Sequence, residues 1–322
     1  MFQEIILLII GLVVLIAGGE FLVRGASRIA LRFQITPLVV GLTIVAFGTS
    51  SPELFISIQS ALAGSPDMTM GNVIGSNICN LALVLGITAV FSPIQVNSDS
   101  IKFDWPMAMG SSFLLYILVI EGYLQRNEGI FFVIILLAYI GFLIHKSRKE
   151  TNAKEIENIG AEMEDKSPEK NSPLHWGMDI VYLTIGCVGL YFGSDWFVNA
   201  AKDIFLEIGI EERIIGLIVL ALGTSLPELV TSIVAAIKKS TDLAIGNLMG
   251  SNIFNVLSIL GITSIIKDIH VSNSIIDYDM MWMLGITLFI LPMMVFNRKI
   301  GRIQGGLLLA IYFYYTYSIF SI

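Results

Sequence analysis

The feature that most constrains this 322-residue chain is an internal repeat. Residues 41–90 align without a gap with residues 216–265, at an offset of 175, and 25 of the 50 aligned positions are identical. Both copies contain the motif Gly-Thr-Ser-x-Pro-Glu, which ends at Glu53 and at Glu228. Both then continue into the motif Gly-Asn-x-x-Gly-Ser-Asn-Ile-x-Asn. The fold must therefore contain two copies of one structural unit, each with an acidic residue beside a proline.

The composition predicts an all-α integral membrane protein. Hydrophobic residues make up 55% of the chain and charged residues only 14%, whereas a soluble protein has about 25% charged residues. A helix needs about 20 apolar residues to cross a bilayer. Ten such segments are present, at residues 2–23, 37–63, 70–91, 105–121, 129–145, 177–198, 213–237, 244–266, 280–296 and 303–321.

Each half of the chain contributes five of these ten transmembrane helices. Since five is odd, the second half must enter the membrane from the opposite side, which predicts two inverted five-helix repeats. We expect the first repeat at residues 1–145 with its core at 37–91, and the second at 176–322 with its core at 213–266. The charged segment 146–175 is expected to be a solvated cytoplasmic linker. In folds of this kind the substrate site lies near the bilayer midplane, where the halves meet.

The positions of the basic residues predict the orientation. If the N-terminus lies outside, 15 of the 19 Lys and Arg residues fall in the inner loops or the central linker. Cytoplasmic loops of membrane proteins carry such an excess of Lys and Arg. We therefore expect both termini outside the plasma membrane and the central linker in the cytoplasm.

Glu53 and Glu228 each lie midway along an apolar span. A charged residue at the bilayer centre costs roughly 2.5–3.5 kcal/mol, so such residues are retained mainly for function. A single one can be a hydrogen-bonded structural group, but two at equivalent positions favour a binding site. Pro52 and Pro227 lack the N–H that would bond the carbonyl four residues earlier, so we expect both helices to bend at Gly-Thr-Ser.

Further oxygen atoms accompany the two glutamates. Two hydroxyl residues precede each glutamate by four and three positions, on the same helix face: Thr49 and Ser50, and Thr224 and Ser225. On the following helix, polar residues spaced four apart share a face, and four of them are site candidates: Ser76, Asn80, Ser251 and Asn255. Hard cations such as Ca²⁺ prefer 6–8 oxygen ligands at about 2.3–2.6 Å. The sequence therefore predicts an all-oxygen cation site.

Several other function classes are not supported. The histidines His145, His175 and His270 lie at helix ends or in loops and form no cluster with cysteines, which argues against a soft-metal site. No nucleophile is paired with a histidine base and no phosphate-binding loop is present, so we expect neither an enzyme nor an ATP-driven pump. We expect no organic cofactor and no nucleic-acid partner, and a monomer suffices for the predicted site.

The paired motifs resemble the α-repeats of the sodium/calcium exchanger family, within the cation/calcium antiporters, in its microbial form. The resemblance implies Na⁺-driven exchange of Ca²⁺, with Glu53 and Glu228 as ligands shared by both ions. It also implies that the hydroxyls before each glutamate bind the ions, together with the backbone oxygens of Ala46 and Ala221. One departure is Asn255, which stands where several relatives, including potassium-dependent exchangers, have Asp. This departure argues against potassium cotransport.

Charge suggests how such a site works. Two ionised carboxylates balance one Ca²⁺, and several Na⁺ ions can replace it, so we expect the site to cross the membrane only when it is filled. Alternating access is expected to come from the first and sixth helices sliding past a fixed core. The nearest alternative is a Ca²⁺/H⁺ antiporter in which the same glutamates titrate. A passive cation channel and a structural membrane scaffold are further alternatives.

Overall fold

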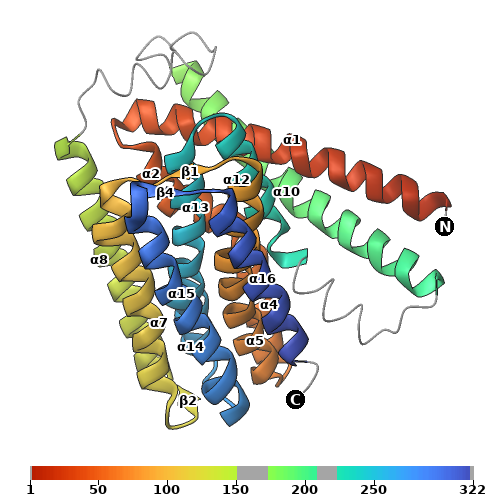
Figure 1. Cartoon of the computed structure of the whole chain (residues 1–322), viewed down its shortest axis with the longest axis vertical. Helices are drawn as coiled ribbons and strands as arrows, with labels where there is room; N and C mark the ends of the chain where they lie inside the picture. The colour runs from red at the N-terminus through yellow and green to blue at the C-terminus, as the bar shows by residue number, and fades with distance from the viewer. Residues whose placement is uncertain (1, 151–172, 209–222, 320–322) are drawn as a thin grey trace.

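The computed structural model describes residues 2–150, 173–208 and 223–319 and shows an all-α membrane protein (Figure 1). Within these ranges, six helices are long and apolar enough to cross a membrane, and a seventh span is counted if the bent pair Pro37–Thr49 and Ser51–Leu62 is taken as one. Some predicted features lie outside the described residues: most of the linker 146–175, the start of the span 213–237, and Ala221.

The helices follow the predicted spans, with several short π-helical turns inserted. The first half contains α1 (Phe2–Phe33), α2 (Pro37–Val40), η1 (Gly41–Val45), α3 (Ala46–Thr49), α4 (Ser51–Leu62), α5 (Pro66–Ile78), η2 (Cys79–Val84), α6 (Leu85–Phe91), η3 (Ser100–Asp104), α7 (Trp105–Val119) and α8 (Arg126–Glu150). The second contains α10 (Pro173–Glu207), α12 (Leu226–Ile237), α13 (Thr241–Phe254), η4 (Asn255–Leu260), α14 (Gly261–Ile266), η5 (Ile275–Asp279), α15 (Met280–Val295), η6 (Phe296–Arg298) and α16 (Arg302–Ile319). The turns η1 to η5 are π-helical, and η6 is a 3₁₀ turn.

Two short strand pairs join loops that are far apart in the sequence. Strand β1 (Ile94–Gln95) pairs antiparallel with β4 (Lys299–Ile300). Strand β2 (Tyr123–Leu124) pairs antiparallel with β3 (Ile269–His270). The β1–β4 and β2–β3 pairs lie at opposite ends of the helix bundle (Figure 1). Each pair therefore ties one loop of the first half to one loop of the second at the same end.

The internal repeat is also seen in the residues at which some helices begin and end. Helices α4 and α12 correspond residue for residue at the offset of 175, and so do the π-helical turns η3 and η5. Each pair thus adopts the same local structure, irregular turns included, although its two sequences are only partly identical.

The two helices that carry the amide-rich motifs form the centre of the bundle. In each of the spans Pro66–Phe91 and Thr241–Ile266, 83% of the most apolar 18-residue stretch is buried inside the protein, whereas the same share in α1 is 28%. In the second copy, Gly246 and Gly250 allow the close approach expected of a small-xxx-small pattern. A Cβ on Gly246 would lie 2.5 Å from the Leu38 carbonyl oxygen, and one on Gly250 would lie 2.7 Å from Leu42 Cα.

The first helices of the two halves form an antiparallel pair, and the pair projects beyond the bundle (Figure 1). A Cβ on Gly11 would lie 2.7 Å from the Phe197 nitrogen, and one on Gly18 would lie 2.7 Å from the Leu190 nitrogen. The partner residue number falls as the α1 residue number rises, so the helices run in opposite directions. Because glycines let the backbones touch, α1 and α10 pack as one unit.

Both helices are longer than the apolar pattern predicted. Helix α1 continues ten residues past the predicted end, to Phe33, and α10 begins at Pro173 and ends at Glu207. The extension of α1 is polar and is held by charge pairs. Arg24 bonds Glu20 one turn earlier at 2.6 Å, and Arg32 bonds Asp179 of α10 at 2.7 Å. Hydropathy locates only the apolar part of a helix, so it did not predict these additional turns, which are stabilised by ion pairs.

The glycine contacts between α1 and α10 predict a strong difference between two Gly→Ala substitutions on α10. A Cβ at Gly186 would lie 2.7 Å from Leu22 Cα, whereas one at Gly177 meets nothing within 4 Å. We expect Gly186→Ala to destabilise the purified protein by about 1–3 kcal/mol through overpacking, and Gly177→Ala to have no such effect. Thermal unfolding in detergent measures both, and equal melting temperatures for the two variants would contradict the close packing.

Candidate cation site

The Gly-Thr-Ser-x-Pro-Glu motifs form a break in a helix. In the first copy, α3 ends at Thr49 and α4 begins at Ser51, and the helical segments Pro37–Thr49 and Ser51–Leu62 are bent by 46°. Ser50 lies between them with φ −86° and ψ 6°. In the second copy, Ser225 precedes α12 with φ −90° and ψ 4°. The bend predicted from the proline is confirmed for the first copy, and the second leaves the helical region at the equivalent serine.

The break places Glu53 and Glu228 in the first turns of α4 and α12, where free N–H groups and the helix dipole favour a negative charge. Both side chains are completely buried. Oε1 of Glu228 accepts hydrogen bonds from the hydroxyls of Ser50 (3.0 Å) and Ser251 (3.5 Å). Because Ser50 precedes Glu53 by three residues, this contact joins the two acidic turns.

Several buried oxygen atoms near the glutamates have no hydrogen-bond partner among the described residues. They are both carboxylate oxygens of Glu53, Oε2 of Glu228, Oγ of Ser225, and Oδ1 of Asn80 and Asn255. Buried polar groups in native proteins are nearly always hydrogen-bonded, so such a cluster is typical of a ligand site. The described ranges contain no group of three or more His, Cys, Asp and Glu side chains that could hold a metal. Two carboxylates with hydroxyl and amide oxygens suit a hard cation.

The other predicted hydroxyls meet across the two copies. Thr49 Oγ1 lies 3.5 Å from Ser251 Oγ, and Thr224 Oγ1 lies 3.5 Å from Ser76 Oγ at the equivalent position. The Thr49 hydroxyl also donates to Oδ1 of Asn247 at 3.2 Å. The structure therefore brings hydroxyl groups from both repeats together.

Of the two predicted backbone ligands, only the carbonyl of Ala46 lies in the described part of the chain. The Ala46 carbonyl accepts a hydrogen bond from the Ser50 N–H at 3.0 Å, and the Thr49 hydroxyl lies 3.3 Å from it. It is thus engaged within the first helix break. The equivalent Ala221 lies outside the described residues.

Two asparagines on the polar face of the following helix, outside the predicted ligand set, hold the acidic turns in place. Asn72 Nδ2 donates to Ser57 Oγ at 2.9 Å and to the backbone carbonyl of Glu53 at 3.2 Å. Asn247 makes the same two contacts in the second copy, to Ser232 Oγ at 3.1 Å and to the carbonyl of the second glutamate at 3.5 Å. The signal was available, because both asparagines lie four residues before a predicted site serine.

The freed carbonyl in the second copy is satisfied by the helix α10. Ser194 Oγ donates to the Gly223 carbonyl at 2.7 Å. Proline at position 227 leaves this carbonyl without its helical partner. The long helix pair thus contacts the break through a hydrogen bond that the sequence analysis did not foresee.

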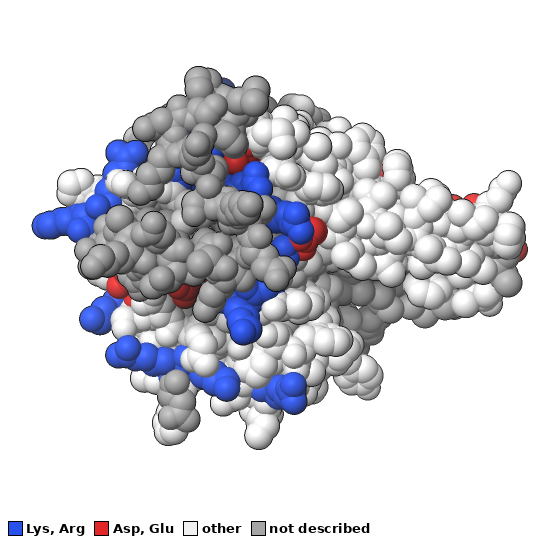
Figure 2. Space-filling view, turned by 90° about the horizontal axis from the view of Figure 1, so that it is seen from above, with Lys and Arg blue, Asp and Glu red and all other residues white. Residues whose placement is uncertain are grey.

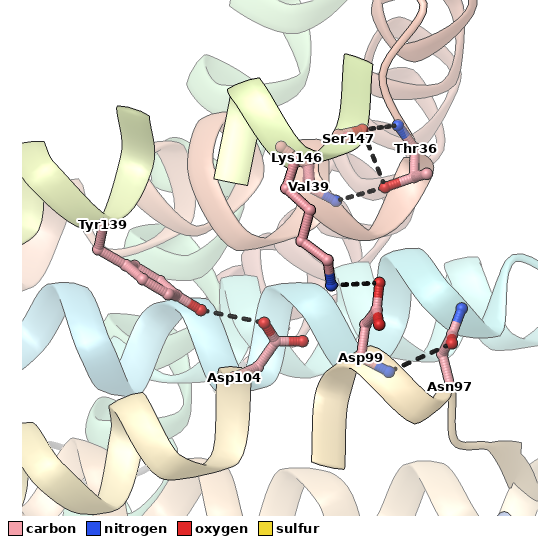
Figure 3. Close-up of polar contacts among 8 residues, drawn as sticks. All are labelled: Thr36, Val39, Asn97, Asp99, Asp104, Tyr139, Lys146 and Ser147. Atoms are coloured by element: carbon pink, nitrogen blue, oxygen red, sulfur yellow. Dashed lines mark hydrogen bonds and ion pairs between the residues drawn. The ribbon is translucent and has the colours of Figure 1, made fainter. Parts of the chain in front are cut away.

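A second pair of acidic residues lies outside the candidate site. Asp104 at the end of η3 accepts a hydrogen bond of 3.0 Å from Tyr139 of α8, and nearby Lys146 pairs with Asp99 at 2.8 Å (Figure 3). The equivalent residue in the second half, Asp279, accepts a bond of 2.9 Å from a tyrosine of α16. These bonds tie each π-helical turn to the last helix of its half.

Comparison with known proteins agrees with this geometry. A family model described as "Sodium/calcium exchanger protein" matches residues 4–145 and 178–321. The chain is 36% identical over 319 residues to the putative antiporter CaxA of Alkalimonas amylolytica, and 30% identical over 344 residues to the sodium/calcium exchanger MaX1 of Methanosarcina acetivorans. Each match covers 98% of both chains.

A solved structure of the sodium-calcium exchanger NCX_Mj, soaked without Na⁺ and Ca²⁺, has a TM-score of 0.82 and 30% identity to this chain, and each covers 99% of the other. The fold and the buried acidic site therefore define a multi-pass membrane transport protein. The chain belongs to the sodium/calcium exchanger family, as the motifs indicated.

The contact between Ser194 and the break predicts a stability loss. Ser194→Ala leaves the Gly223 carbonyl buried without a partner, which costs about 1–3 kcal/mol. Thr184→Ala on the same helix is the matched control, because Thr184 is exposed and, among the described residues, its hydroxyl bonds the Ile180 carbonyl of its own helix. We expect a lower melting temperature for Ser194→Ala and little change for Thr184→Ala. A melting temperature of Ser194→Ala equal to that of the wild type would show that the bond is not made.

Proposed function

We propose that this protein is a Na⁺/Ca²⁺ antiporter that moves Ca²⁺ against Na⁺ through one shared site near the middle of the membrane. The observation that carries the proposal is a pair of completely buried glutamates, joined through the Ser50 hydroxyl, whose carboxylate oxygens mostly have no partner among the described residues. The similarity to MaX1 and NCX_Mj supports Na⁺ and Ca²⁺ as the transported ions. Both ions are substrates, and the proposal includes no enzymatic step and no organic cofactor.

The proposed ligands are the residues with oxygen atoms around the two breaks. Glu53 and Glu228 bind both ions. Hydroxyl, amide and backbone oxygens complete the coordination: Thr49, Ser50, Ser76, Asn80, Thr224, Ser225, Ser251 and Asn255, with the carbonyls of Ala46 and Ala221. Support comes from the hydroxyl contacts between the two copies and from the unpartnered amide oxygens.

The charge of the site makes exchange obligatory. Two ionised carboxylates are balanced by one Ca²⁺ or by several Na⁺ ions, whereas an unbalanced buried charge is strongly unfavourable. The conformational change that carries the site across the membrane is therefore accessible only when the site is filled. We infer that α1 and α10 move together past the core, because their backbones touch through glycines. Glu20 of α1 forms an ion pair with Lys238 at the end of α12, which links this unit to the core.

The proposed architecture is ten transmembrane helices in two inverted repeats, residues 1–145 and 176–322, separated by the cytoplasmic linker 146–175. The antiparallel arrangement of α1 and α10 supports the inversion. The strand pairs support the span count, because β1–β4 joins two predicted inner loops and β2–β3 joins two predicted outer loops. Lys and Arg side chains gather at the end of the bundle that Figure 2 shows, on the side of β1 and β4. We propose that the protein lies in the plasma membrane with this end facing the cytoplasm and both termini outside.

Neutralising either buried glutamate tests the function. We expect Glu53→Gln and Glu228→Gln each to reduce Na⁺-gradient-driven uptake of radioactive Ca²⁺ into proteoliposomes by at least about 100-fold, because the remaining carboxylate cannot balance Ca²⁺. Glu121→Gln is the matched control, since Glu121 is an exposed acidic residue in the loop before β2, and it should leave uptake unchanged.

Two outcomes would contradict this function. Full uptake by either Glu53→Gln or Glu228→Gln would show that the carboxylate is not a ligand of the transported cation. Uptake by the wild-type protein that is driven by a pH gradient in the absence of Na⁺ would favour a Ca²⁺/H⁺ antiporter instead.

The proposed orientation predicts which positions a membrane-impermeant maleimide reaches in intact cells. In a background with Cys79 and Cys187 replaced by Ser, a cysteine at Glu121 should be labelled from outside, and one at Lys239 should be labelled only after the membrane is permeabilised. The reverse pattern would place the termini in the cytoplasm. Labelling of both positions in intact cells would contradict the proposed span count.

A further inference from the structure

Asn77 lies in the centre of the bundle, where α5 crosses the second copy of the amide-rich motif, and it is buried. Its Nδ2 donates to the backbone carbonyl of Asn252 at 3.3 Å and to the Met283 sulfur at 3.6 Å. A carbonyl oxygen can only accept a hydrogen bond, so this contact determines which end of the Asn77 amide is the NH₂ group. The opposite end must therefore be the oxygen.

The orientation of Asn77 determines that of Asn255. Oδ1 of Asn77 accepts a hydrogen bond of 3.0 Å from Nδ2 of Asn255. Because Oδ1 of Asn77 is an acceptor, Asn255 must present its NH₂ group to it. Oδ1 of Asn255 is then directed elsewhere, and it is buried with no partner among the described residues. Asn255 opens η4, which packs against α4, the helix that carries Glu53.

We propose that Asn77 is a positioning residue for the cation site, which holds the amide of Asn255 so that its oxygen, and not its NH₂ group, faces the transported cation. This inference rests on the proposed function of the site. An amide turned the other way would direct two N–H dipoles towards the cation, which repel it. Asn77 itself contributes no ligand, because its donors and its oxygen are all engaged with the protein.

The equivalent pair in the other half is not joined. Asn252 corresponds to Asn77 and Asn80 corresponds to Asn255 at the offset of 175. Asn252 Nδ2 donates to the Leu248 carbonyl of its own helix at 2.8 Å. Both side-chain polar atoms of Asn80 are without a partner in the described part of the chain. The site thus has one amide that the protein orients in advance, at Asn255, and one that the bound cation orients, at Asn80.

A double-mutant cycle tests this role. The measurements are the Kd of Ca²⁺ for purified protein in Na⁺-free buffer, by calorimetry, and the Ca²⁺ concentration at half-maximal uptake in proteoliposomes. We expect Asn77→Ala and Asn255→Ala each to raise both values about tenfold. The double variant should bind no more weakly than Asn255→Ala alone, because Asn77 acts only through Asn255. Two single effects that multiply in the double variant would overturn the inference.

Two further variants separate positioning from packing. Asn77→Leu keeps the side-chain volume but removes the acceptor, and we expect it to weaken Ca²⁺ binding as Asn77→Ala does. Met283→Leu removes a contact of Asn77 but leaves the Asn252 carbonyl, and we expect its Kd to stay within about twofold of the wild type. An Asn77→Leu protein with wild-type affinity, or a Met283→Leu protein as weak as Asn77→Ala, would overturn the inference.

The same experiments distinguish this inference from the function on which it rests. Wild-type protein that shows Na⁺-dependent Ca²⁺ uptake, with an unchanged Kd in Asn77→Ala, would overturn the positioning role alone. Wild-type protein without Na⁺-dependent uptake would overturn the exchange function and the inference with it.

Discussion

The burial of two carboxyl groups inside the membrane is the constraint on which the rest of this structure depends. Glu53 and Glu228 are completely buried, Ser50 of the first acidic turn bonds Glu228, and three of the four carboxylate oxygens have no partner among the described residues. A helix N-terminus beneath each carboxylate offsets part of the unfavourable energy, and in the proposed function a bound cation offsets the remainder. In the proposed exchange, one Ca²⁺ balances the charge of two ionised carboxylates.

Duplication explains how such a site is assembled. One break in one helix supplies a carboxylate and two hydroxyls, which is too few oxygens for a hard cation. The second copy supplies the same groups from the other side, and contacts such as Ser50 to Glu228 and Thr49 to Ser251 join the two. The copies are not identical in their contacts, however. Glu228 accepts two hydroxyls, whereas no hydroxyl in the described residues bonds Glu53.

Much of this arrangement could be predicted from the sequence. The repeat, the breaks, the buried glutamates and the serines and threonines around them follow from spacing and from the chemistry of proline. Contacts that depend on three-dimensional packing could not be predicted. The bond from Ser194 to Gly223 requires knowing that α10 lies beside the break, and the amide orientation of Asn255 depends on a backbone carbonyl of another helix. The π-helical turn that begins at Asn255 could not be recognised from the hydropathy of its residues.

The central claim is that the two glutamates bind one transported cation together. The most direct measurement is an anomalous difference map from crystals soaked in Ca²⁺ without Na⁺. A shared site predicts one strong peak between α4 and α12, about 2.3–2.6 Å from carboxylate oxygens of both Glu53 and Glu228. A peak bound by only one of these residues, or Ca²⁺ bound elsewhere while the two carboxylates stay uncoordinated, would contradict it.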